Sequence, residues 1–197
     1  PITALARAAQ LPGLTQVRAS MPRTRAATGP VALQGDFVQG SSALRAQYPG
    51  LTGKGLTIGL LSDSFDCYSY YAAKGPSAQG NGYNGYAINS FTASAATDVT
   101  SGALPAAVDV VEEADCGNYG APQLRPYGDE GRAMAQIVHV VAPGAQLAFH
   151  TASNSEADFA DGITRLQQLG ATIIVDDVGY PDEPFFQDGV IAQAINA

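Results

Sequence analysis

Short apolar runs separated by helix-like segments constrain this chain's fold more than any other feature. Residues 56–62 (LTIGLLS) form a continuous apolar run of strand length, typical of a parallel strand that is covered on both faces. Residues 145–151 (AQLAFHT) and 171–178 (ATIIVDDV) have the same character. A further strand is expected over residues 108–112. Together these runs predict one sheet that is buried on both sides.

Helical patterns fill the intervals between the later strands. Asp129 can cap a helix that runs to about Val141, where Ala142-Pro143-Gly144 stops it. The sequence Ser155-x-x-Asp158 resembles a capping box and predicts a second helix, which Gly170 ends. That helix places three apolar residues on one face: Phe159, Ile163 and Leu166. Shorter helices are expected over residues 43–48, capped by Ser41 or Ser42, and from residue 187 onward.

Alternating strands and helices imply βαβ units. We therefore predict an α/β fold, a doubly wound parallel sheet with helices on both faces. The 197 residues suffice for one domain with a sizeable core. We expect residues 1–40 to form a loosely structured lead-in or pro-segment remnant, and residues 41–197 to form the α/β domain.

The distribution of charge excludes some classes of partner. The net charge of −8 argues against a nucleic-acid binder, and no apolar run reaches the roughly 18 residues of a membrane helix. Residues 1–50 nevertheless hold five arginines and one aspartate, a local charge of +4. This segment is either a basic arm on an acidic body or a flexible terminus with ordinary arginines.

The two cysteines, Cys67 and Cys116, fit no zinc motif. They either form a disulfide or are two unrelated buried thiols. Five tyrosines lie among Gly, Ser and Asn between them, a composition that favours a surface loop over a strand pair. A loop of this kind favours export, so we expect a secreted or extracytoplasmic protein.

Carboxylates cluster where strands end or helices begin. Asp63 directly follows residues 56–62, Asp176 and Asp177 finish a strand, and Glu130 opens a helix. In parallel sheets, sites gather at the carboxyl ends of the strands, so these residues suggest a carboxylate-lined cleft. Glu130 and its neighbour Asp129 also fit a simple capping role, because a helix N-terminus favours negative charge.

The order and spacing of these motifs resemble the subtilisin-like serine peptidases (subtilases). The resemblance covers about residues 41–197 and rests on a strand ending in Asp63-Ser64, Glu130-Gly131 at a helix start, and Val-Ala-Pro-Gly-Ala at 141–145. It implies that residues 41–197 are the N-terminal part of a subtilisin-like peptidase domain, and that Asp63 is a catalytic Asp. It also implies that Asp177, Val178 and Gly179 belong to a strand edge that binds the backbone of a peptide or protein substrate.

Two departures from the subtilase pattern shape the functional expectation. Glu130 stands where subtilases have their catalytic His, which resembles the acid-acting sedolisins, although Met134 stands where sedolisins have an Asp. The Gly-Thr-Ser-x-Ala motif of the nucleophile is absent. We therefore expect the serine beyond residue 197, in a C-terminal segment of the same precursor.

The resulting hypothesis is a serine endopeptidase in which Asp63 and Glu130 share a proton, with an acid-shifted pH optimum. The alternative is a catalytically inactive subtilase-fold module with a binding or structural role. His139 and His150 are interpreted as structural, and with two histidines and no ligand spacing a catalytic zinc site is not expected. The pairs Asp176/Asp177 and Asp182/Glu183 either bind Ca²⁺ or are solvated acidic loops.

Overall fold

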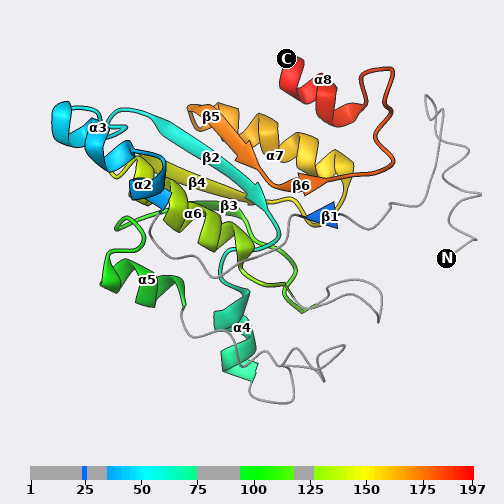
Figure 1. Cartoon of the computed structure of the whole chain (residues 1–197). Coiled ribbons are helices and arrows are strands. Elements are labelled where there is room, and N and C mark those ends of the chain that lie inside the picture. Colours follow the sequence, from blue (N-terminus) through cyan, green and yellow to red (C-terminus); the bar gives the residue numbers. More distant parts are fainter. Residues whose placement is uncertain (1–23, 26–34, 75–93, 118–126) are drawn as a thin grey trace, which may run out of the picture.

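A four-stranded parallel sheet forms the centre of the computed structural model, which describes residues 24–25, 35–74, 94–117 and 127–197 (Figure 1). The strand order is β3-β4-β2-β5, and all three neighbouring pairs are parallel. The strands are β2 (Thr57–Ser62), β3 (Asp109–Glu112), β4 (Gln146–Thr151) and β5 (Ala171–Asp176). The predicted α/β class is confirmed, with a parallel sheet flanked by helices.

The central strand β2 is buried as its apolar sequence predicts. Its residues from Ile58 to Ser62 are all buried, and Leu60 and Leu61 are fully inaccessible to solvent. Hydrogen bonds to β4 and β5 satisfy its backbone on both edges. Because β2 is covered above, below and on both sides, the residue that follows it enters a buried environment.

The two faces of the sheet are covered by different helices (Figure 1). Helix α6 (Glu130–Val141) packs with Leu60, Leu147 and Phe149 on one face. Helix α7 (Glu156–Gln168) buries its apolar side against Leu61 on the other face. That side consists of the residues predicted from the sequence: Phe159, Ile163 and Leu166.

The start of α7 confirms the predicted cap. The Ser155 hydroxyl accepts a hydrogen bond from the Asp158 N–H, at 3.1 Å. The serine cap predicted for the first helix is wrong. Helix α3 (Ser41–Gln47) already includes both serines, and its N-cap is Gly40, which has no side chain to donate or accept. A four-residue helix, α2 (Gly35–Val38), precedes it.

The strand predicted over residues 171–178 differs from the structure in two ways. β5 ends at Asp176, and it is half-exposed because it lies at the sheet edge, with Ile173 44% exposed. A separate short strand, β6 (Val178–Gly179), follows it. β6 pairs antiparallel with β1 (Thr24–Arg25), which lies in the predicted lead-in, as α2 does.

The segment between the cysteines begins as a helix rather than as the predicted loop. Helix α4 (Cys67–Lys74) contains its first tyrosines, and residues 75–93 lie outside the described residues. Helix α5 (Ala95–Ser101) follows, and α8 (Val190–Asn196) begins three residues later than predicted. The predicted lead-in also lies outside the described residues at 1–23 and 26–34. Within the described chain, no helix is long and apolar enough to span a membrane.

Candidate active site

Asp63 is fixed at the carboxyl end of β2 by backbone donors. The residue is fully buried. One carboxylate oxygen accepts the N–H of Glu130 and the other accepts the N–H of Gly128, both at 2.8 Å. The Ser64 N–H donates to the same carboxylate at 2.5 Å. Asp63 therefore satisfies the first N–H group of α6, that of Glu130, and the N–H of Gly128 just before the helix.

The backbone of Asp63 is held as firmly as its side chain. The hydroxyl groups of Thr151 and Ser153 both donate to the Asp63 carbonyl oxygen, at 2.8 and 2.7 Å. These two residues lie at and just after the end of β4. The position of Asp63 is thus determined by two adjacent strands and by one helix.

Glu130 is the first residue of α6, and its own N–H places it beside Asp63. It is buried, with 7% of its surface exposed. The next residue, Gly131, allows this close approach. A Cβ there would lie 2.3 Å from the Phe149 ring and 2.8 Å from the Ser64 carbonyl oxygen. Packing alone therefore accounts for glycine after Glu130, independent of any reaction.

The sequence predicts that Asp129 caps its own helix, α6. In the structure, its side chain caps another helix instead. Its φ of 53° is left-handed, and its side chain makes no capping bond to α6. The carboxylate instead accepts the N–H groups of Cys67 and Tyr68, at 2.8 and 3.1 Å, in the first turn of α4. Since Asp63 already occupies the N-terminus of α6, the Asp129 side chain is available for α4.

A buried arginine balances part of this negative charge. Arg132 contacts Asp129 and Asp98, each with an N–O distance of 2.9 Å. Burial raises the pKa of Asp129 to about 6, although the Arg132 guanidinium acts in the opposite direction. Asp129 therefore changes charge in the mildly acidic range.

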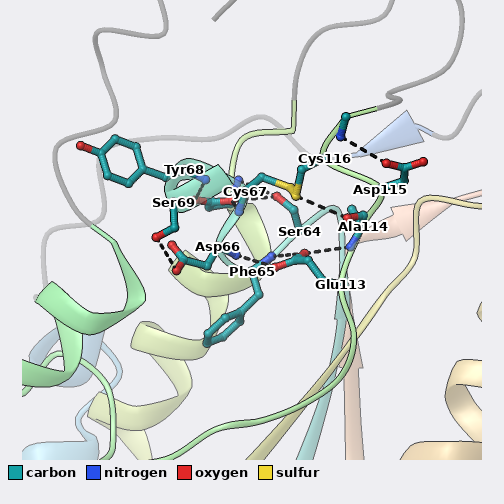
Figure 2. The surroundings of a disulfide bond; sticks show 12 residues. Ser64, Phe65, Asp66, Cys67, Tyr68, Ser69, Glu113, Ala114, Asp115 and Cys116 are labelled. Carbon is teal, nitrogen blue, oxygen red and sulfur yellow. Dashed lines mark hydrogen bonds between the residues drawn. A yellow bond between two sulfur atoms is a disulfide. The ribbon is translucent and has the colours of Figure 1, made fainter. Parts of the chain in front are cut away.

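Glu113 holds the loop after Asp63, a role that the sequence does not reveal (Figure 2). Its carboxylate accepts the N–H groups of Phe65 and Asp66, at 2.9 and 2.7 Å, and that of Ala114 at 2.8 Å. Burial raises its pKa, and these bonds lower it in part. No local sequence signal marks Glu113, because two of its partners, Phe65 and Asp66, are distant along the chain.

A disulfide ties the same loop to the segment after β3 (Figure 2). The structure joins Cys67 and Cys116 across a sequence separation of 49, which agrees with the disulfide interpretation of these cysteines. Cys67 is also the first residue of α4. The loop from Asp63 to Cys67 is therefore held by two carboxylates and one covalent bond.

The predicted substrate-binding residues lie at the same edge of the sheet as Asp63. Val178 and Gly179 form β6, and Asp177 precedes them. Just after β6, the Tyr180 hydroxyl donates to the Ala152 carbonyl at 2.6 Å, and the Ala152 N–H donates to Ser62 at 2.6 Å. Two hydrogen bonds thus connect β6 with the residue that precedes Asp63.

The remaining residues singled out in the sequence lie away from the residues around Asp63. Met134 packs with the core on the α6 face and supplies no second acid. His139 lies in the last turn of α6, and burial lowers its pKa. His150 is fully buried on β4. Two groups of acidic, histidine or cysteine side chains among the described residues are close enough to share an ion. Neither group includes Asp176/Asp177 or Asp182/Glu183, the pairs considered for Ca²⁺.

Comparisons of this chain with models of protein families, with curated proteins and with solved structures find no match.

Proposed function

We propose that this chain carries the acidic half of a serine endopeptidase site of subtilisin-like fold, with the nucleophilic serine outside residues 1–197. The observation that carries the proposal is the 2.8 Å hydrogen bond between the Asp63 carboxylate and the Glu130 N–H. The bond brings together the two predicted catalytic residues, which are far apart in the sequence. Both lie at the carboxyl end of the central strand, where parallel sheets place their sites.

In the proposed reaction, Glu130 accepts the serine proton as the hydroxyl attacks the substrate carbonyl. A free glutamate has a pKa of about 4.3 and is a weak base. In the proposal, a second carboxylate beside Glu130 would share this proton with it. Asp63, fixed by its backbone donors, is the second carboxylate. This arrangement favours activity at acidic pH.

The pairing of β6 supports a substrate role for Asp177, Val178 and Gly179. Gly179 lies opposite Thr24 and Val178 opposite Arg25 in an antiparallel ladder. A substrate strand would pair with the same edge in place of β1, because backbone hydrogen bonds bind a strand whatever its side chains are. Export of the protein is part of the proposal, since disulfides such as Cys67–Cys116 persist in oxidising compartments.

A second candidate is an inactive module that keeps the fold for binding. Two observations favour it. The Asp63 carboxylate already accepts three backbone N–H groups, a structural role that needs no catalysis. Met134 packs in the core, so α6 offers Glu130 no carboxylate one turn further along.

Active-site labelling separates the two candidates. The precursor that contains this sequence is treated with a fluorophosphonate at acidic and neutral pH, and the labelled residue is mapped by mass spectrometry. The peptidase proposal predicts labelling of one serine outside residues 1–197, lost in Glu130→Gln and kept in the control Asp161→Asn. Absence of labelling in a folded precursor that cleaves no peptide establishes the inactive module.

A further inference from the structure

Three potential metal ligands from different elements meet on the α7 face of the sheet. Glu112 ends β3, His150 lies on β4, and Asp158 lies in the first turn of α7. Their ligand atoms all lie within 4.8 Å of one another. Glu112 and His150 are opposite each other in the β3–β4 register, and their Oε2 and Nε2 atoms are 3.6 Å apart.

The His150 ring is oriented for coordination by its own backbone. Its Nδ1 lies 2.7 Å from the Thr151 carbonyl oxygen. A carbonyl oxygen only accepts hydrogen bonds, so Nδ1 carries a proton, and a metal ion would bind at Nε2 in place of a proton there. Metal-binding histidines are commonly held in this way, with one ring nitrogen bonded to a carbonyl and the other facing the ion.

The Nε2 atom of His150 is buried without a hydrogen-bond partner. The residue is fully buried, and Nε2 faces Glu112. The ring lies against Gly162 of α7, where a Cβ would be 2.7 Å from Nδ1. A buried polar atom without a partner is costly, unless it binds a group that the protein itself does not provide.

The two carboxylates can move toward a shared ion. Both are partly exposed, and both accept the Asn154 amide, at 3.3 Å for Glu112 and 3.0 Å for Asp158. Arg165 also donates to Glu112 at 2.8 Å, which compensates part of the negative charge. Burial and the nearby Glu112 charge raise the pKa of Asp158, an effect that a bound cation would oppose.

We propose that Glu112, His150 and Asp158 form a binding site for a divalent transition-metal ion of the Zn²⁺ type. One imidazole nitrogen and two carboxylate oxygens match the ligands that Zn²⁺ takes, at about 2.0–2.2 Å. The nitrogen disfavours Ca²⁺ and Mg²⁺, which select oxygen ligands. The ion would join β3, β4 and α7 on the face of the sheet opposite α6.

The test is a Zn²⁺ titration of the disulfide-intact chain by calorimetry, without reductant. Reduction would free Cys67 and Cys116 beside Glu113, a second group of possible ligands. The variants are Glu112→Gln and Asp158→Asn, whose partly exposed side chains are safer to change than the buried His150. The control is Asp188→Asn, an exposed carboxylate just before α8 whose hydrogen bonds involve none of the three ligands. Circular dichroism checks that each variant is folded.

We expect one Zn²⁺ per chain, bound at least about tenfold more weakly by either ligand variant and unchanged in the control. The chain has two histidines, so the imidazole signals in nitrogen NMR of the uniformly 15N-labelled chain come from His139 and His150 alone. Zn²⁺ should shift the His150 Nε2 signal and leave that of His139 unmoved. The proposal is overturned if Zn²⁺ does not bind, if both ligand variants bind as the wild type does, or if only His139 shifts.

Discussion

The two faces of the sheet satisfy their acidic side chains in different ways. On the α6 side, the Asp63, Asp129 and Glu113 carboxylates accept backbone N–H groups from neighbouring segments. On the α7 side, Glu112 and Asp158 are partly exposed and have mainly side-chain partners. The first set is anchored to the fold, whereas the second can rearrange around a ligand.

The carboxylates on the two sides therefore differ in how far they can move. Backbone donors at a helix N-terminus cannot move without unwinding the helix, so Asp63 keeps one position. The Asn154 amide and the Arg165 guanidinium are at the ends of side chains. They can rotate away from Glu112 and Asp158 at a small cost in free energy. The α6 face is thus suited to holding catalytic groups in register, and the α7 face to taking up an ion. The predictions below test this contrast.

The largest expected effect comes from removing the disulfide on the α6 side. The double variant Cys67→Ser, Cys116→Ser should lower the free energy of unfolding by about 4 kcal/mol, because the bond closes a loop of 49 residues. Urea denaturation measures the loss. Amide exchange should increase most in residues 63–68, which the bond holds directly, and less in α7. A loss below about 1 kcal/mol would show that the carboxylates alone hold the loop.

Gly131→Ala is the next most disruptive change. Its methyl group would overlap the Phe149 ring and the Ser64 carbonyl, so we expect a loss of about 2–3 kcal/mol in unfolding free energy. Gly35→Ala is the matched control, since nothing lies within 4 Å of that Cβ. Equal thermal stability of the two variants would refute the close approach of α6 to β4.

Titration of Asp129 should make the α6 side pH-dependent. Its pKa is about 6 in the folded chain and about 3.8 in an unfolded one, so the folded state binds the proton more tightly. Stability contributed by the protonated form is present below about pH 4 and decreases by about 3 kcal/mol as the pH rises through 6. Glu113, whose pKa is also raised, acts in the same direction.

The measurement is the free energy of unfolding between pH 4 and 7 for the wild type and for Asp129→Asn. Asparagine cannot ionise, so the variant should show a shallower decrease with pH. Parallel curves for the two proteins would mean that Asp129 does not titrate in this range.

The smallest effect is expected on the surface of α7. Asp161 pairs with Arg165 at 2.8 Å, but its side chain is 54% exposed. Solvent screens such a pair, so Asp161→Asn should cost about 0.5 kcal/mol or less. Thermal denaturation at low and high salt checks this. A loss above about 1 kcal/mol would show that the α7 side is as tightly coupled as the α6 side.

Local patterns predict the strands and long helices well. A strand that is buried on both faces has a continuous apolar sequence, and a helix that packs on the sheet has one apolar face. The run at 56–62 becomes β2 (Thr57–Ser62), and the Ser155 cap is present. Exposure of β5 is not predictable from its apolar sequence, since it depends on the strand order of the sheet.

The site is predictable only in part, for a similar reason. Asp63 and Glu130 stand out because they follow a strand and open a helix. Glu113 and the actual partners of Asp129 depend on contacts between distant segments, which no spacing encodes. The same holds for His150, whose neighbours Glu112 and Asp158 come from two other elements.

The most direct test of the proposed Asp63–Glu130 pair is the pH dependence of kcat/KM. It is measured for the longer protein that the proposal requires and for its Glu130→Gln variant. We predict an acidic optimum for the wild type and a loss of at least about 100-fold in the variant, the usual contribution of a general base. The control Asp161→Asn should keep the wild-type profile. Full activity of Glu130→Gln at neutral pH would contradict the proposed role of Glu130.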